Sequence, residues 1–289
     1  MSPAENLPVL AGVDASDHSI AAVQWAVTEA RLRRRPLWLV HAYSVPLVTA
    51  PVLAPPYDWQ QDASREAAEA VLERAVRVAR REGPDVVVNG DLATGPAGDA
   101  LVELSGRAHL VVVGHRGHGG FVSLLLGSVA SKLAAHAPGP VIVTRAGQPS
   151  PPSAAAPVVV GVDGSVVSHA AIGFAFEEAD LRGVPLQAVH AWQPPPAPLG
   201  DVRLDRRELE AAELHEVGQW LRPWQQKFPQ VPVTTTLAAG HAAGVLVEAG
   251  RNATLVVVGS RGRGAFTGLL GSASQQVVHH ATCPVAVVR

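Results

Sequence analysis

The chain has 289 residues and a mass of 30.1 kDa, about twice the usual size of one domain, which favours two domains. Hydrophobic residues make up 47% and charged residues 17%, enough apolar material for full cores and too little charge for a disordered polymer. With a formal net charge of -2 and an isoelectric point near 6.6, neither nucleic acid nor an anionic membrane is expected as a partner.

Short β-branched runs alternate with helical patterns along the first half. In chain order, the pattern predicts strands at about 8–13, 37–42, 85–90, 109–114 and 140–145, and helices at about 18–34, 60–82, 97–107 and 128–137. Near-continuous apolar strands such as residues 110–113 are typical of a parallel sheet that is covered on both faces. This alternation predicts a doubly wound α/β fold with right-handed crossovers.

The second half repeats the first in the same order. Segments 10–16 and 38–43 return 149 residues later as 159–165 and 187–192, and segment 111–117 returns 145 residues later as 256–262. Ordered self-similarity of this kind is the signature of repeated units. The predicted domains are 1–147 and 158–289, each with a five-stranded parallel sheet and helices on both faces. Prolines and small residues predict an extended linker at 148–157.

Cysteine content and the first residues bear on the compartment. Cys283 is the only cysteine, which excludes an intrachain disulfide and a cysteine-based zinc site, and its apolar neighbours predict a thiol at the core edge. The N-terminal residues lack the pattern of a secretory signal, and no run approaches the ~18 apolar residues of a membrane span. We expect a cytoplasmic protein without membrane contact.

Polar residues and glycines follow four predicted strands in each half. In an open parallel sheet, ligands bind outside the carboxyl ends of the strands, near the point where strand order reverses. The repeated residues expected there are Asp14, His41, Gly95 and Gly114 in the first half, and Asp163, His190, Gly240 and Gly259 in the second. Four loops should therefore converge on one rim of each domain.

The strongest signal is the glycine-rich segment 114–128, which leads into a predicted helix. Glycines let the backbone approach a ligand closely, and free amides at a helix start can hold phosphate oxygens. The segment therefore predicts a phosphate cradle. Nearby cations, Arg116 and His118 or Arg261 and Arg263, either add charge to the cradle or stay solvated.

Several side chains at the rim have a second, structural interpretation. Ser128 and Ser272 are expected to be N-caps of the last helix of each domain, a role that is compatible with a phosphate contact. Asp14 and Asp163 either contact a ligand or satisfy turn and cap amides. His41 and His190 are interpreted as polar lining residues, because no metal-ligand spacing accompanies them. No metal site is predicted.

Known enzyme motifs do not fit the cradle. A P-loop needs a lysine after its glycines, and neither Lys132 nor Lys227 occupies such a place, which excludes a Walker-type ATPase. The first strand is not followed by the dinucleotide fingerprint, so a nicotinamide dehydrogenase is disfavoured. No nucleophile with a neighbouring base repeats between the halves, so efficient catalysis is not expected, while slow ATP hydrolysis stays open.

These residues resemble the universal stress protein family in its tandem form, over nearly the whole chain. The resemblance rests on the Gly-Val-Asp opening, the Val-His-Ala after strand two, and the motif Gly-x2-Gly-x9-Gly-Ser/Thr, which residues 114, 117, 127 and 128 meet fully. It implies Rossmann-like domains of adenine-nucleotide-binding type that bind ATP, with Mg²⁺ as an optional companion.

The same resemblance implies a set of nucleotide-binding residues. Asp14 and Ala42 would line the adenine and ribose pocket, while the glycine loop with Ser128 and Val129 would hold phosphates. In the first domain the implied residues are Gly12, Val13, Asp14, Ala15, His41, Ala42, Gly114, His115, Arg116, Gly117, His118, Gly119, Gly120, Gly127, Ser128 and Val129. In the second domain they are Gly161, Val162, Asp163, Gly164, His190, Ala191, Gly259, Ser260, Arg261, Gly262, Arg263, Gly264, Gly271, Ser272 and Ala273.

The second domain departs from the motif by one residue. Only eight residues separate Gly262 from Gly271, and one deletion turns the following helix by roughly 100° unless the loop absorbs it. The resemblance further implies that the closing strands, which would otherwise leave exposed edges, pair across the two domains and, in a homodimer, across chains.

The expected function is that of a stress regulator whose partner is an adenine nucleotide. Bound ATP would stabilise the conformation or assembly that binds it best. One alternative is an enzyme, either a slow ATP hydrolase or a nucleotide hydrolase or AMP-forming enzyme on a similar sheet; the latter requires turnover well above background that a single substitution at the rim abolishes. The other is a nucleotide-free interaction scaffold, which the shortened second loop favours.

Overall fold

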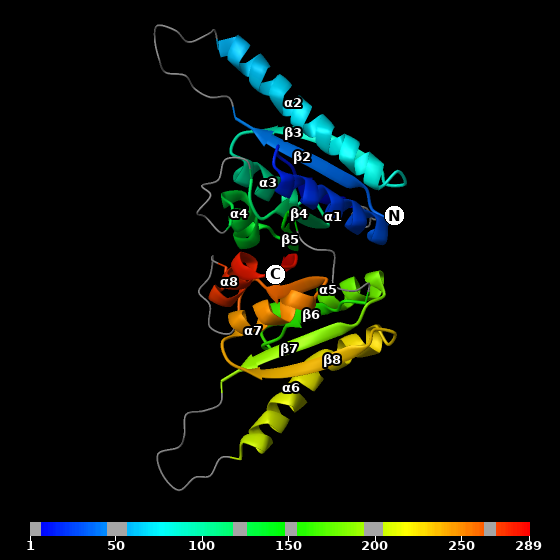
Figure 1. Ribbon diagram of the computed structural model, residues 1–289, viewed down its shortest axis with the longest axis vertical. Helices are drawn as coiled ribbons and strands as arrows, with labels where there is room; N and C mark the ends of the chain where they lie inside the picture. The colour runs from blue at the N-terminus through cyan, green and yellow to red at the C-terminus, as the bar shows by residue number, and fades with distance from the viewer. Residues whose placement is uncertain (1–6, 45–56, 118–125, 148–154, 194–204, 263–269) are drawn as a thin grey trace. The chain divides into compact units, whose positions relative to one another are not determined.

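The structure is a computed structural model that describes residues 7–44, 57–117, 126–147, 155–193, 205–262 and 270–289, with the side chains of 57–60 left undescribed. The chain divides into two compact units, Met1–Ala146 and Gly147–Arg289, and each is described by itself (Figure 1).

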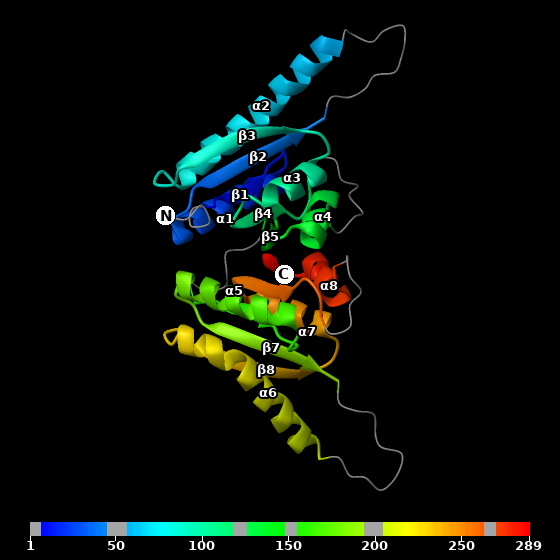
Figure 2. The ribbon, with the colours of Figure 1, turned by 180° about the vertical axis from the view of Figure 1, so that it is seen from behind.

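The first unit is a parallel sheet between two pairs of helices. Its elements are β1 (Val9–Gly12), α1 (Asp17–Arg33), β2 (Leu37–Tyr43), α2 (Tyr57–Glu82), β3 (Val88–Thr94), α3 (Ala97–Ser105), β4 (Leu110–Gly114), α4 (Ser128–His136) and β5 (Val141–Thr144). The strand order is β3-β2-β1-β4-β5. Val9 of β1 lies opposite both Leu37 and Leu110, so strand order reverses beside β1. Helices α1 and α2 cover one face, and α3 and α4 the other (Figure 1, Figure 2).

The second unit repeats this architecture. Its elements are β6 (Val158–Gly161), α5 (Val166–Arg182), β7 (Leu186–Trp192), α6 (Arg206–Lys227), β8 (Val233–Ala239), α7 (Ala242–Ala249), the 3-10 helix η2 (Gly250–Asn252), β9 (Leu255–Gly259), α8 (Ser272–His280) and β10 (Val285–Val288). The strand order is β10-β9-β6-β7-β8, again with parallel neighbours. The predicted doubly wound α/β fold is confirmed for both units.

The cores follow from the apolar runs of the central strands. In β4 and β9, which share the sequence LVVVG, every residue before the final glycine is buried. Burial on both faces explains why these strands show no alternation of apolar and polar residues. The thiol of Cys283 is also buried, as its apolar context predicted.

The third strand lies later in the chain than predicted. The sequence pattern predicted a strand at 85–90, whereas β3 runs over Val88–Thr94. The valines before it belong to a turn, in which the amide of Val86 donates to the carbonyl of Gly83. β3 is an edge strand and largely exposed, so it contains polar residues and lacks the apolar run by which a buried strand is predicted.

Each unit buries an ion pair one turn from the end of its first helix. Glu29 of α1 is fully buried, and its Oε2 lies 3.2 Å from Nε of Arg33, whose side chain is 6% exposed. The corresponding atoms of Glu178 and Arg182 in α5 lie 3.0 Å apart. Removing one partner of a buried ion pair leaves the other charge uncompensated, which strongly destabilises the folded state. The two pairs therefore make the stability of each unit depend on both of their residues.

Replacing Arg33 with methionine should strongly destabilise the first unit. The change keeps an apolar stem but removes the guanidinium that lies 3.2 Å from the buried Glu29 carboxylate, and breaking a buried ion pair typically costs about 3–5 kcal/mol. Urea denaturation followed by circular dichroism measures the change in the free energy of unfolding. Arg65→Met is the matched control, because its pair with Glu69 is exposed on both sides. Equal, small effects of both changes would contradict the proposed role of the buried pair.

Candidate functional site

In the first unit, the carboxyl ends of β1, β2 and β4 meet the start of α4 around one cavity. Its volume is about 290 Å³. Its lining consists of Gly12, Val13, Asp14, Ser19, His41, Ala42, Ala97, Leu101, Val113, Gly114, Arg116, Gly117, Gly127, Ser128, Val129 and Ala130. The cavity lies at the strand-order reversal, where ligand sites of open parallel sheets form.

Asp14 is held in place by the turn that starts α1. Its Oδ1 accepts hydrogen bonds from the amide of Ser16 at 2.9 Å and from the Ser16 hydroxyl at 2.6 Å. The amide of Asp14 donates to the hydroxyl of Ser19 at 2.9 Å, and Ser16 caps α1 by accepting from the amide of Ser19. The turn-and-cap chemistry predicted for Asp14 is therefore present, and it fixes the carboxylate at the cavity wall.

Two glycines allow close backbone contacts around the loop after β4, one of them with this carboxylate. A Cβ on Gly117 would lie 2.6 Å from Oδ2 of Asp14, well inside van der Waals contact. A Cβ on Gly127 would lie 3.2 Å from the carbonyl oxygen of His115. Only glycine allows the backbone to pass this close to Asp14 without displacing it.

The start of α4 faces the cavity without a side-chain cap. Its N-cap is Gly127, which has no side chain to bond the first amides, and Ser128 is the first helical residue. Ser128 was predicted as the N-cap, and that prediction is wrong, as is the same prediction for Ser272, since Gly271 caps α8. The reason is that the extended conformation required of a cap falls one residue earlier. The helix thus presents amides and the Ser128 hydroxyl to the cavity, an arrangement suited to an anion.

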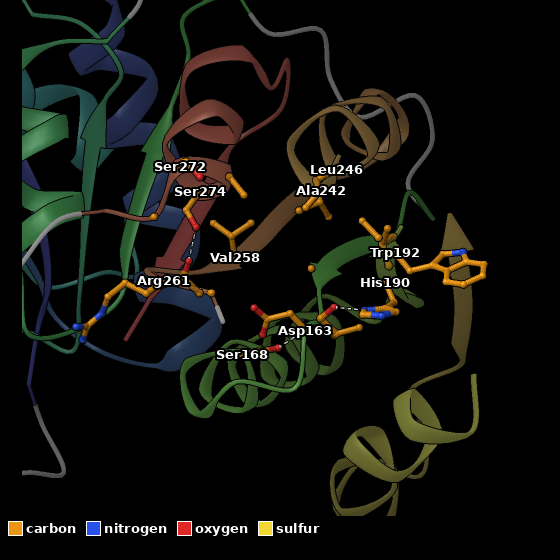
Figure 3. A pocket seen from close by; sticks show the side chains of 18 of the residues that line it. Asp163, Ser168, His190, Trp192, Ala242, Leu246, Val258, Arg261, Ser272 and Ser274 are labelled. Atoms are coloured by element: carbon orange, nitrogen blue, oxygen red, sulfur yellow. Dashed lines mark hydrogen bonds between the residues drawn. The ribbon is translucent and has the colours of Figure 1, made fainter. Parts of the chain in front are cut away.

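The second unit forms a corresponding cavity of about 550 Å³ (Figure 3). Its lining consists of Gly161, Val162, Asp163, Ser168, Val189, His190, Ala191, Trp192, Gln193, Glu213, Ala242, Leu246, Val258, Gly259, Arg261, Gly262, Gly271, Ser272, Ala273 and Ser274. Oδ1 of Asp163 accepts from the amide of Ser165 at 2.9 Å, as in the first unit. A Cβ on Gly262 would lie 2.8 Å from Oδ2 of Asp163.

The one-residue deletion in the second glycine motif does not turn the following helix. The amide of Gly271 donates to the carbonyl of Ser260 at 2.8 Å, matching the 2.7 Å bond from Gly127 to His115. Helices α4 and α8 both begin one residue after that glycine and have nine residues each. The difference in length is therefore taken up between Gly262 and Gly271, and the cavity wall keeps its geometry.

The histidines at the ends of β2 and β7 are oriented by the backbone. Nδ1 of His41 lies 2.7 Å from the carbonyl oxygen of Val13, and Nδ1 of His190 lies 2.7 Å from that of Val162. Both rings line their cavities, as predicted. In the described ranges, no group of three or more histidine, cysteine, aspartate or glutamate residues is placed to hold a metal ion.

Some residues implied by the resemblance lie elsewhere. Ala15 and Gly164 do not line the cavities. His115 and Ser260, the residues after the glycines that end β4 and β9, are not among the lining residues and are 5% and 0% exposed. Five others lie outside the described residues: His118, Gly119, Gly120, Arg263 and Gly264.

His115 is the most strongly perturbed titratable group near the site. Burial, reinforced by the charge of Arg145, lowers the pKa of His115 to about 3. Its ring packs edge-on against His18 at 4.4 Å between centroids, and burial also lowers the pKa of His18. Both rings are therefore neutral near pH 7, which avoids adding charge beside the arginines.

Sequence reasoning missed several lining residues. Three pairs repeat between the halves, and a closer self-comparison finds them: Ser19 with Ser168, Ala97 with Ala242, and Leu101 with Leu246. Val189, Trp192, Gln193 and Glu213 line only the second cavity. Glu213 belongs to no repeated motif. It lies in α6, and only the packing of α6 decides which of its residues face the cavity.

Comparison with known proteins identifies the family. The model of the universal stress protein family matches residues 6–145 and 156–289. Universal stress protein Rv2005c of Mycobacterium tuberculosis is 39% identical over 99% of this chain and 98% of its own length. Universal stress protein Rv2623 of the same species is 38% identical over 98% and 97%.

A solved structure shows the same fold over the whole chain. The universal stress protein from Archaeoglobus fulgidus matches with a TM-score of 0.70 and 20% identity, over 99% of this chain and 97% of that one. In the described part of the chain, no helix is long and apolar enough to span a bilayer. Its paired sequence motifs, its repeated α/β units and these relatives agree that the chain belongs to the universal stress protein family.

Proposed function

We propose that this chain is an ATP-binding regulator of the stress response, in which bound nucleotide stabilises a conformation or assembly. The observation that carries the proposal is the pairing, in both units, of an uncapped helix start with a glycine that leaves room only for backbone. Free amides and a helix dipole attract phosphate oxygens without any charged side chain. Cavities of 290 and 550 Å³ are close to the range of small-molecule sites.

The residues of each cavity fit the two ends of such a ligand. Phosphates would lie at the glycine loop and the first amides of α4 or α8, near Arg116 or Arg261. The base and ribose would lie toward Asp14 and Ala42, or Asp163 and Ala191. A Mg²⁺ ion that came with the nucleotide would take its ligands from phosphate oxygens and water.

A bound nucleotide would regulate the protein by stabilising the state that binds it. A ligand that binds only the folded state at a hundred times its Kd stabilises that state by about 2.7 kcal/mol. Nucleotide would therefore favour whichever arrangement of loops and domains holds it best, and that arrangement would be the one partners recognise.

The direct test is to denature freshly purified protein and identify the released nucleotide by chromatography. We expect ATP in both domains, so the amount released should approach two molar equivalents. One equivalent would restrict the function to a single domain. Release of ADP with measurable turnover would favour a slow hydrolase. An empty protein whose melting temperature does not rise with added ATP would contradict the proposal and favour a scaffold.

A further inference from the structure

The two cavities are built from matching residues with one exception. All 16 described residues that line the first cavity have a counterpart, at the equivalent position of the repeat, among the 20 described residues that line the second. The four additional residues of the second cavity are Val189, Trp192, Gln193 and Glu213. They come from the end of β7, with the residue after it, and from α6, so the additional described lining of the second cavity gathers at this wall.

Glu213 brings a carboxylate to this wall. Its Oε2 lies 3.1 Å from Nε2 of His190, and its side chain is 35% exposed. Its other oxygen, Oε1, has no hydrogen bond with any residue in the described ranges. In the first cavity, the only described partner of His41 is the carbonyl of Val13, and none of the α2 side chains that the structure describes lines the wall. Among the described residues, the acid therefore belongs to the second cavity alone.

The contacts of His190 show why the carboxylate stays in place. The carbonyl of Val162 can only accept, so Nδ1 of His190 donates to it. Nε2, on the other side of the ring, faces Oε2 of Glu213 at hydrogen-bond distance. Trp220 packs edge-on against the same ring at 5.7 Å between centroids. The contacts with Val162 and Trp220 fix the His190 ring, and the ring in turn orients the Glu213 carboxylate.

The acid lies at the opposite end of the cavity from the anion-binding features. Arg261 and His190 lie on either side of Asp163, with Trp192 beside His190 (Figure 3). One end thus offers free helix amides, and the other offers hydrogen-bond acceptors. A ligand that fits both ends has anionic oxygens at one end and a hydrogen-bond donor at the other.

We propose that Glu213 is a specificity-determining residue, which makes the second cavity select nucleotides with a hydrogen-bond donor remote from the phosphates. The inference rests on the proposed nucleotide binding. The donor is either the exocyclic amino group of the base or a ribose hydroxyl, and both are hydrogen-bonded by a carboxylate. The first cavity lacks the acid and accepts nucleotides without this preference.

The test compares three nucleotides at each cavity of the full chain. Gly117→Val blocks the first cavity, so that titration calorimetry reports the second, and Gly262→Val does the reverse. Quenching of Trp192, which lines the second cavity, gives an independent signal. The ligands are ATP, purine riboside triphosphate, which lacks the amino group, and 2′,3′-dideoxy-ATP, which lacks the ribose hydroxyls.

We expect one analogue to bind the second cavity about 10- to 100-fold more weakly than ATP, the usual worth of a hydrogen bond to a charged group. Whichever analogue it is identifies the donor. The first cavity should bind all three alike. Glu213→Met should remove the preference, and Glu213→Gln should keep part of it, because its amide oxygen still accepts. Glu216→Met is the control, since Glu216 is exposed on α6 and lies outside the cavity.

Equal preferences at both cavities, or a preference that survives Glu213→Met, would overturn the inference and leave nucleotide binding intact. Failure of the Gly117→Val protein to bind any nucleotide would instead refute the proposed function of the second domain, and this inference with it. The melting temperature of each variant shows that the comparison is made on folded protein.

Discussion

Replacing Gly117 with valine is expected to halve the nucleotide released per mole of chain. The new Cβ would lie 2.6 Å from Oδ2 of Asp14, whose Oδ1 is already bound by Ser16, so the carboxylate cannot move away freely. The loop must then leave the carboxylate, which removes the close backbone approach that phosphates require. Chromatography of the nucleotide from denatured protein measures the loss.

Two further variants make this result specific. Gly262→Val places a Cβ 2.8 Å from Oδ2 of Asp163 and should remove the nucleotide of the second domain in the same way. Gly244→Val is the control, because a Cβ on Gly244 meets nothing within 4 Å. The proposed site would be wrong if Gly117→Val and Gly262→Val both retained full nucleotide content and unchanged melting temperatures.

The second large effect is a loss of folding stability at acid pH, which depends on His115. His115 is buried and neutral, and its pKa is lowered from 6.5 to about 3, whereas in the unfolded chain it binds a proton below about 6.5. Between these values the unfolded state holds more protons, so the stabilisation is complete above pH 6.5 and is lost as pH falls toward 3. Each such proton contributes a slope of about 1.4 kcal/mol per pH unit.

His115→Gln should therefore flatten the loss of stability in acid. The glutamine amide is not protonated in this range. The slope of the free energy of unfolding against pH, between pH 6.5 and 4, should therefore decrease by the amount that corresponds to about one proton. Denaturation curves at a series of pH values measure it. His215→Gln is the control, because that ring is exposed on α6. An unchanged slope in His115→Gln would show that His115 is protonated in the folded state.

Local sequence preferences predicted most elements because their signals are short-range. Ser16 and Ser165 start α1 and α5 as N-caps that accept from residues three positions on. The apolar runs of β4 and β9 identified the buried strands. The prediction failed at β3, where an edge position removes the need for apolar residues, and at Ser128, where cap and first helical residue differ only in backbone conformation.

The sequence by itself determined the two repeated α/β units, since strand and helix periodicity are properties of neighbouring residues. Only the tertiary structure decided which distant side chains complete each cavity. Glu213 reaches His190 from 23 residues further along the chain, while His115, outside the cavity lining, packs edge-on against His18. Such meetings depend on how helices pack on the sheet, which no local pattern specifies.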